Sequence, residues 1–171
     1  EGAETTVDKR ILEEMKDPIM HLIRNAIDHG LEAPEERERA GKPRLGSVWI
    51  RASQTAASIV IELQDDGRGL NPEAIKRTAL QRKLARPEAL EAMALDQLQA
   101  LVFMPGFSTA QFVTDISGRG VGLDVVRTTV ENLKGSVQVE STPGAGCIFR
   151  VRLPITLATA RVLIVQASRR P

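Results

Sequence analysis

Apolar residues recur at every third or fourth position between residues 11 and 27 of the chain. This spacing places them on one face of a helix, which we expect to run through about Asp28 and to stop at Gly30. Pro18 lies inside the pattern and lacks a backbone N–H, so we expect a kink or a break there. The polar segment 31–45 that follows predicts no more than a short helical turn.

The rest of the chain switches between strand-like and helix-like patterns. Residues 47–53 and 58–64 alternate apolar and polar side chains across a short polar link, which predicts a β-hairpin. Further patterns predict helices over 72–82, 87–102 and 121–133, strands over 136–142 and 147–154, and a fifth strand or the start of another domain at 160–165. This order predicts an α+β fold, a two-layer α/β sandwich with helices on one face of a mixed, mostly antiparallel sheet.

Composition narrows the class of function. The 171 residues include 23 Lys and Arg and 22 Asp and Glu, so the net charge of +1 gives no sign of a nucleic-acid partner. Tyrosine is absent and aromatic residues make up 3%, which disfavours a base-stacking surface. No apolar run approaches the length of a membrane span, so we expect no membrane insertion. The single cysteine, Cys147, excludes an internal disulfide and favours a reducing, cytoplasmic compartment.

The segment HLIRNAIDHG at 21–30 is the first candidate site. His21, Asn25 and His29 follow one another at intervals of four, so they lie near one face of a helix. The amide oxygen of Asn25 is a hard, neutral ligand that suits Mg²⁺ together with phosphate oxygens. His21, His29 or the neighbouring Arg24 could contact the metal or the phosphates. The alternative interpretation is an amphipathic helix whose polar face meets solvent.

The segment Asp65-Asp66-Gly67-Arg68-Gly69 directly follows a predicted strand. A carboxylate at the end of a strand can accept a hydrogen bond from an exocyclic amine such as adenine N6. The two glycines would let the backbone approach a flat ring. A tight acidic turn without a ligand remains the alternative.

Two further glycine-rich segments follow. GRGVGL at 118–123 opens a predicted helix, where exposed N–H groups and the helix N-terminus attract phosphate. It fits neither a dinucleotide-binding fingerprint nor a P-loop, because no buried strand precedes it and no Gly-Lys-Ser/Thr follows. TPGAGC at 142–147 is by itself typical of a hairpin turn.

In this order, the motifs resemble the GHKL superfamily of Bergerat-fold ATPases and kinases. More closely, they resemble the ATP-binding domain of the CheA-like chemotaxis histidine kinases. Residues 21–30 match that family's N box, 65–69 and 118–126 its two glycine boxes, and 103–109 its F box. The resemblance covers about residues 7–157.

The resemblance implies that the chain is part of a larger kinase. Residues 1–18 would be the end of a dimerisation region or linker helix, and 19–157 the ATP-binding kinase domain. Residues 158–171 would begin a receptor-coupling domain or form a tail. The sequence GKP at 41–43 also fits the family, and LPITLA at 153–158 matches its junction to the coupling domain.

The resemblance also implies a bound ATP and Mg²⁺. Asn25 would ligate the metal with His21 as a second contributor, both as catalytic residues, and Asp65 would bind the adenine amine. The other nucleotide-binding candidates are Arg24, Asp28, His29, Gly67, Gly69, Leu70, Ser117, Gly118, Arg119, Gly120, Val121, Gly122 and Leu123.

A lid over the nucleotide is implied as well. It would span about residues 86–119 and be anchored by Phe103 and Phe107. One departure concerns the residue after Gly146, which is often Thr or Ser in these families and is Cys147 here. Its thiol is a poor donor, and we expect Cys147 to be structural.

The implied reaction is transfer of the γ-phosphoryl group to a histidine in two-component chemotaxis signalling. The chain has two histidines, His21 and His29, both inside the N box, so we expect the acceptor on a separate phosphotransfer domain of the same parent kinase. Receptors and coupling proteins would act through neighbouring domains, and a response regulator indirectly.

The alternatives to a kinase are a GHKL ATPase and a non-catalytic nucleotide-sensing module. GHKL ATPases place a water-activating Glu four residues before the Asn, where this chain has His21. This difference favours transfer over hydrolysis.

Overall fold

A four-stranded antiparallel sheet forms one layer of the structure, a computed structural model that describes residues 9–55, 57–107 and 122–155. Its strands are β1 (Val48–Gln54), β2 (Ser58–Asp65), β3 (Ser136–Thr142) and β4 (Gly146–Pro154). They are ordered β1-β2-β4-β3, and every pairing among them is antiparallel. The expected two-layer α+β fold is thereby confirmed.

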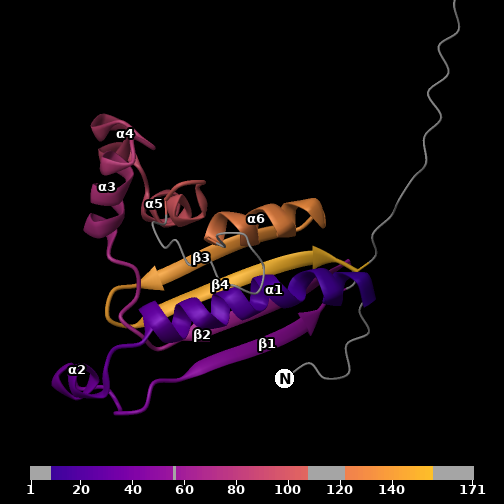
Figure 1. Cartoon of the computed structure of the whole chain (residues 1–171), viewed down its shortest axis with the longest axis horizontal. Coiled ribbons are helices and arrows are strands. Elements are labelled where there is room, and N and C mark those ends of the chain that lie inside the picture. The colour runs from indigo at the N-terminus through magenta and orange to yellow at the C-terminus, as the bar shows by residue number, and fades with distance from the viewer. Residues whose placement is uncertain (1–8, 56, 108–121, 156–171) are drawn as a thin grey trace, which may run out of the picture.

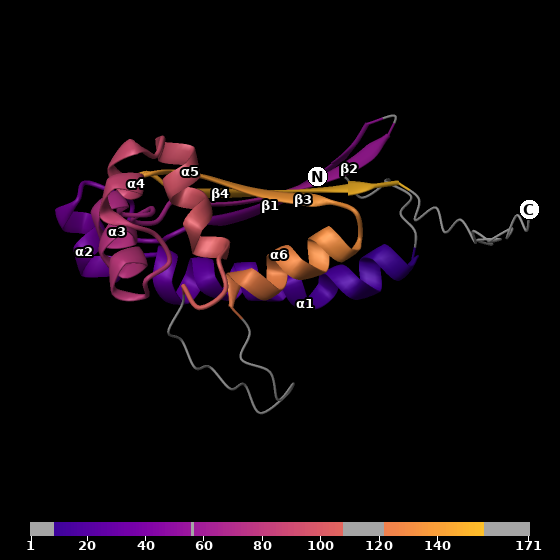
Figure 2. The same cartoon turned by 90° about the horizontal axis from the view of Figure 1, so that it is seen from above.

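The helices lie on one face of this sheet and at one of its ends (Figure 1). They are α1 (Lys9–Asn25), a π-helical turn η1 (Ala26–Gly30), α2 (Pro34–Arg39), α3 (Pro72–Gln81), α4 (Pro87–Ala92), α5 (Leu95–Ala100), a 3-10 turn η2 (Leu101–Phe103) and α6 (Leu123–Asn132). Figure 2 shows α1 and α6 side by side over the sheet, with α3, α4 and α5 gathered at one end. This arrangement places the end of α1 and the start of α6 above the same part of the sheet.

The core lies between the sheet and the α1–α6 pair. Side chains alternate across a strand, so every second residue of β2 and β4 points at these helices. Leu63 pairs with Phe149 and Ile59 with Leu153, and all four side chains are at most 5% exposed. From the helices, α1 adds Ile11, Met15 and Leu22, and α6 adds Val126 and Val130.

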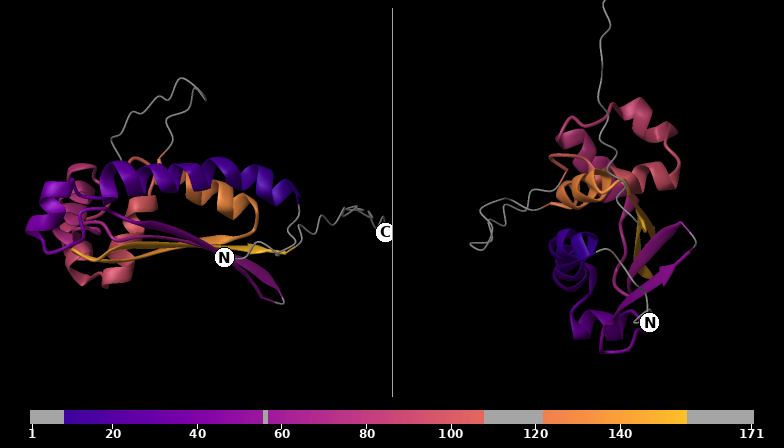
Figure 3. Two further views of the ribbon diagram at one scale, coloured as in Figure 1. Left: turned by 90° about the horizontal axis from the view of Figure 1, so that it is seen from below. Right: turned by 90° about the vertical axis from the view of Figure 1, so that its right-hand side faces the viewer.

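The opposite face of the sheet carries a row of alternating charges. Arg51 on β1 lies 3.4 Å from Glu62 on β2, and Glu62 lies 2.8 Å from Arg150 on β4. Arg150 also pairs with Glu140 on β3, so the row crosses all four strands. Among the described residues no helix covers this face (Figure 3). The sheet therefore buries one face and exposes the other, as the alternation in its sequence predicts.

Two of the helix predictions need correction. Pro18 does not break the first helix, because α1 continues from Lys9 to Asn25 with the proline ring buried in it. The predicted helix over 87–102 is instead α4, α5 and the turn η2. Met93 and Ala94 interrupt it with extended backbone, at ψ 135° and 160°. The side chain of Gln97 accepts the Ala94 N–H at 3.1 Å and so starts the second helix.

Parts of the expected organisation concern residues that are not described. The possible fifth strand at 160–165 and the segment 158–171 lie outside the described residues. The boundary between residues 18 and 19 stays a prediction, and α1 crosses it without interruption. Within the described ranges, no helix combines the length and the apolar character needed to cross a membrane.

Candidate functional site

Three of the four glycine- or asparagine-containing motifs meet at one end of the sheet. The Arg68 N–H donates to the Gly30 carbonyl at 2.8 Å, which ties the 65–69 loop to the end of the N box. The Gly144 N–H donates to the Arg68 carbonyl at 2.7 Å, which ties the same loop to the β3–β4 turn. The TPGAGC turn, which the sequence alone described as a hairpin, is therefore also part of the site.

Close backbone approach explains two glycines of the 65–69 loop. A Cβ atom at Gly67 would collide with the carbonyl of Gly30, and one at Gly69 would collide with the carbonyl of Thr142. Gly69 also has φ +70°, a conformation that L-residues rarely adopt. In this structure the two glycines are thus required for contact between loops. Their expected contact with a base stays a prediction.

Asp65 ends β2 with a carboxylate that is only 2% exposed. Its Oδ1 accepts the N–H of Gly67 at 2.9 Å and the N–H of Cys147 at 3.3 Å. No donor of the described residues reaches its Oδ2. Burial raises the pKa of Asp65, and the two N–H donors offset only part of that rise. The carboxylate is a buried acceptor that is held firmly through one oxygen.

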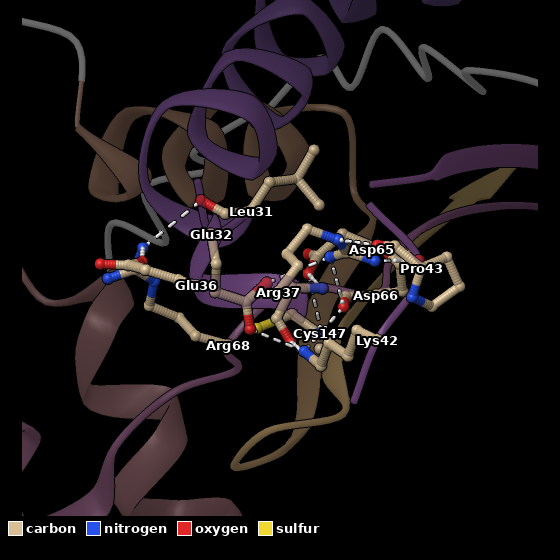
Figure 4. Close-up of polar contacts among 12 residues, drawn as sticks. Leu31, Glu32, Glu36, Arg37, Lys42, Pro43, Asp65, Asp66, Arg68 and Cys147 are labelled. Carbon is tan, nitrogen blue, oxygen red and sulfur yellow. Dashed lines mark hydrogen bonds and ion pairs between the residues drawn. The ribbon is translucent and has the colours of Figure 1, made fainter. Parts of the chain in front are cut away.

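Asp66 is turned toward a different set of partners. Its Oδ2 accepts from Arg37 at 2.9 Å and its Oδ1 from the Ser47 N–H at 2.9 Å. Figure 4 shows the two neighbouring carboxylates with their separate contacts. Of these two carboxylates, only that of Asp65 has an oxygen that no donor of the described residues reaches, and its expected contact with a ligand stays a prediction.

The N box occupies the end of α1 and the π turn η1 (Figure 1). His21 and Asn25 are half-buried, whereas Arg24, Asp28 and His29 are exposed. The Leu31 N–H donates to the Ala26 carbonyl at 2.8 Å, the wider ring of a π-helix, which often occurs at functional sites. Helical periodicity did not predict this turn, because the extra residue leaves the apolar spacing almost unchanged.

His21 lies within electrostatic reach of α6. Burial lowers the pKa of His21, the charge of Arg24 lowers it further, and the charge of Asp124 in the first turn of α6 raises it. The net pKa of His21 is lowered, so the imidazole is neutral at pH 7. A neutral imidazole can accept a proton or bind a metal ion.

The second glycine box is described only at its end. Gly122 precedes α6 with extended backbone, and Leu123 packs partly against the core. Ser117, Gly118, Arg119, Gly120 and Val121 lie outside the described residues. Their expected contact with phosphate therefore remains a prediction.

The F-box phenylalanines are described, although most of the expected lid is not. Phe103 is 2% exposed and packs edge-on against Phe149 of the sheet, with ring centroids 6.2 Å apart. Phe107 packs partly against the same core. Phe103 thus attaches segment 101–107 to the sheet and Phe107 attaches it to the core, directly before residues 108–121, which are not described. Their expected role as anchors of a lid stays a prediction.

Two residues beneath the site were not found from the sequence. Ser141 Oγ accepts the Leu70 N–H at 2.7 Å and donates to the Gly146 carbonyl at 2.9 Å. Gln99 of α5 bonds both backbone groups of Ser141, at 2.7 and 3.2 Å. The alternation of β3 and β4 would have placed Ser141 beside Cys147. Gln99 stands among apolar residues of a predicted helix, and nothing in that pattern indicated that its side chain is buried.

Cys147 lies in this lower layer of the site. Its Sγ is 3.3 Å from Ser141 Oγ, and the side chain is 5% exposed. Burial raises the pKa of the Cys147 thiol, which keeps it protonated at neutral pH. These features fit the expected structural role.

The described residues contain no group of three or more His, Cys, Asp or Glu side chains that could hold a metal ion. Asn25 has no hydrogen bond to another described side chain and is half-buried. A single amide does not hold Mg²⁺ without further oxygen ligands. The site suits Mg²⁺ only if phosphate oxygens complete its coordination.

Comparison with known proteins places this site in a family. The family model of histidine kinase-, DNA gyrase B- and HSP90-like ATPases matches residues 14–157. The chain belongs to this ATPase family. The matched range begins inside α1, ends after β4 and includes every candidate site residue.

Relatives of this ATPase domain include a chemotaxis protein and a sensor histidine kinase. The chain is 47% identical to the chemotaxis protein CheA of Bacillus subtilis, over 96% of this chain and 25% of that protein. It is 43% identical to the sensor histidine kinase CheAY of Helicobacter pylori, over 96% of this chain and 20% of that protein. The chain thus spans a quarter or less of the length of these relatives.

A solved structure shares the fold of this ATPase domain. The catalytic domain of histidine kinase ThkA superposes with a TM-score of 0.51 at 17% identity. The match covers 84% of this chain and 67% of that one. At this identity the likeness concerns the fold alone.

Proposed function

We propose that this domain binds Mg-ATP and transfers its γ-phosphoryl group to a histidine on a separate phosphotransfer domain. The observation that carries the proposal is the carboxylate of Asp65. It is buried at a strand end, held through Oδ1 by two backbone N–H groups, and reached at Oδ2 by no donor of the described residues. An adenine amino group is a donor suited to Oδ2.

The N box supplies the second part of the proposal. Asn25 would hold Mg²⁺ together with phosphate oxygens, and His21 would contribute from the preceding turn of α1. The metal would neutralise charge on the transferred phosphoryl group when bound. Arg24 and His29 are exposed beside them and would face the phosphates, and Asp28, also exposed, is a further candidate for the nucleotide site.

The third part concerns transfer rather than hydrolysis. Where related ATPases carry a water-activating Glu, this chain carries His21 with a lowered pKa. As the alternative to a metal contact, its neutral imidazole would accept the proton from the incoming histidine of the acceptor domain, because its single free ring nitrogen cannot bind Mg²⁺ and a proton together. Steady ATP turnover without any acceptor would instead favour the alternative of a GHKL ATPase.

The similarity to the CheA proteins supports a place in chemotaxis-type two-component signalling. The proposal includes a cytoplasmic parent kinase that carries the acceptor histidine. It also includes receptors and coupling proteins reached through neighbouring domains, and a response regulator reached indirectly. Within the parent, residues 1–18, 19–157 and 158–171 would be the linker helix, kinase domain and coupling junction.

The Asp65→Asn variant tests nucleotide binding. The loss of a charged acceptor is expected to weaken ATP binding by roughly tenfold or more in isothermal titration calorimetry. Asp96→Asn, at an exposed position in the first turn of α5, is the matched control and should bind as the wild type does. Equal affinity of the two variants for ATP would show that Asp65 does not bind the nucleotide.

A further inference from the structure

The polar segment 31–45 holds the most deeply buried basic side chain among the described residues. Arg37, in the short helix α2, is 1% exposed. Burying a guanidinium group is costly unless its donors are all bonded and its charge is paired. The hydrogen-bond partners of Arg37 therefore show which part of the molecule segment 31–45 stabilises.

Two of the five hydrogen bonds of Arg37 go to Asp66 of the 65–69 loop. Arg37 donates through Nη2 to the Asp66 carboxylate at 2.9 Å, and through Nη1 to the Asp66 carbonyl at 3.2 Å. Its remaining contacts are with Glu32 at 3.1 Å and with the carbonyls of Pro43 at 2.7 Å and Leu45 at 3.4 Å. The Arg37 side chain thus hydrogen-bonds both the backbone carbonyl and the carboxylate of Asp66 (Figure 4).

Lys42 donates hydrogen bonds to the same loop, at Asp66 and at the following residue, Gly67. Its Nζ donates to the Gly67 carbonyl at 2.7 Å and to the Asp66 carbonyl at 3.0 Å. It also pairs with Glu32 at 2.7 Å, and Glu32 pairs with Arg37 at 3.1 Å, so one carboxylate links the two cations. Two consecutive carbonyls of the loop are therefore held from the side of segment 31–45.

The geometry of one peptide unit links these contacts to Asp65. The Asp66 carbonyl and the Gly67 N–H belong to one planar, trans peptide unit, so they point in opposite directions. With the carbonyl fixed by Arg37 and Lys42, the Gly67 N–H is aimed at Asp65 Oδ1, 2.9 Å away. One of the two N–H groups that hold the Asp65 carboxylate is thus fixed by two side chains that do not hydrogen-bond to Asp65.

We infer that Arg37 and Lys42 are positioning residues for adenine recognition, which they serve by fixing the Asp66–Gly67 peptide that orients Asp65. The inference rests on the proposed function, because it assumes that Asp65 binds the base. Segment 31–45 would then set the affinity of the domain for adenine nucleotides without contacting them.

The Lys42→Met variant tests this role. It keeps most of the aliphatic side chain but removes the donors to the Asp66 and Gly67 carbonyls. The expected result is a dissociation constant for ATP raised roughly tenfold. In the ¹⁵N–¹H spectrum of the nucleotide-free chain, the Gly67 amide proton should move upfield as its hydrogen bond to Asp65 weakens. Lys42→Arg, which restores the donors, should return both readouts toward the wild type.

Arg44→Met is the matched control. Arg44 belongs to the same segment but pairs at the surface with Glu35 at 3.1 Å and Glu38 at 3.2 Å. Its loss should leave ATP affinity and the Gly67 signal unchanged. If Lys42→Met does not fold, Lys42→Gln, whose shorter side chain carries an uncharged NH2 group, is judged by the same two readouts.

The outcomes separate this inference from the proposed function. If the wild-type chain does not bind ATP, the proposed function fails and the inference fails with it. If the wild type binds ATP and the Lys42 variant binds it equally well, only the inference is overturned. Weaker binding with an unmoved Gly67 signal would also overturn it, because the effect would then not pass through the Asp66–Gly67 peptide.

Discussion

At the scale of single residues, neighbouring positions of the 65–69 loop have different roles. Asp65 faces the site, Asp66 anchors the loop to Arg37, and Gly67 and Gly69 let it touch neighbouring backbone. The sequence predicted a ligand-binding role for Asp65 from its position at a strand end, and that role stays a prediction. It could not predict the role of Asp66, because Arg37 reaches Asp66 across 29 residues and only the folded chain brings them together.

The close approach at Gly69 can be tested against a glycine of the same backbone conformation. Gly69 and Gly41 have φ +70° and +72°, but only at Gly69 would a Cβ meet another backbone. Gly41→Ala should cost about 1 kcal/mol of unfolding free energy for the left-handed conformation alone. Gly69→Ala should cost about 3 kcal/mol, because the loop must also move. Urea unfolding measures both, and equal losses would contradict the contact with Thr142.

The raised pKa of Asp65 predicts a pH dependence of ATP binding. Only the ionised carboxylate accepts fully from an adenine amine, so affinity should fall as the pH drops through the pKa of Asp65. The fall should begin at a higher pH than for an ordinary aspartate. A carboxyl whose folded pKa is raised favours the folded state as it protonates, so Asp65 does not itself promote unfolding there.

Titration calorimetry across that pH range checks this prediction, with Asp65→Asn as the control for protonation of the nucleotide. The difference between wild type and variant should shrink as the pH falls. A constant difference would mean that Asp65 does not titrate in this range.

At the scale of elements, alternation predicted the strands well because the sheet buries only one face. Residues 136–142 form a strand as expected, and the hairpin strands are displaced by at most one residue. The prediction of one continuous helix over 87–102 was wrong, because the helical spacing of apolar residues continues across the break at Met93. The π turn and the burial of Arg37 are not reflected in the spacing of apolar residues, and so could not be predicted.

One element-scale link joins α5 to the floor of the site. The Gln99 amide satisfies the backbone N–H and carbonyl of Ser141 on the edge strand β3. Gln99→Leu should destabilise the fold by about 2 kcal/mol, because two buried backbone groups lose their partners. Gln81→Leu, at the exposed end of α3, is the control. A midpoint of urea unfolding that matches the control would contradict this link.

At the scale of the whole molecule, the fold presents one helix-covered face and one charged face. The site lies where the end of α1, the β2 loop and the β3–β4 turn come together (Figure 2). Both histidines of the chain, His21 and His29, belong to the N box. Under the proposed function, the acceptor histidine would therefore come from another domain.

The most direct test of this conclusion is transfer of labelled phosphate from γ-labelled ATP. The wild-type chain, with Mg²⁺ and the histidine-bearing domain of its parent kinase, is expected to label that domain with acid-labile, base-stable phosphate. His21→Gln should bind ATP yet transfer little. Steady release of free phosphate without an acceptor, or undiminished transfer by His21→Gln, would contradict the account.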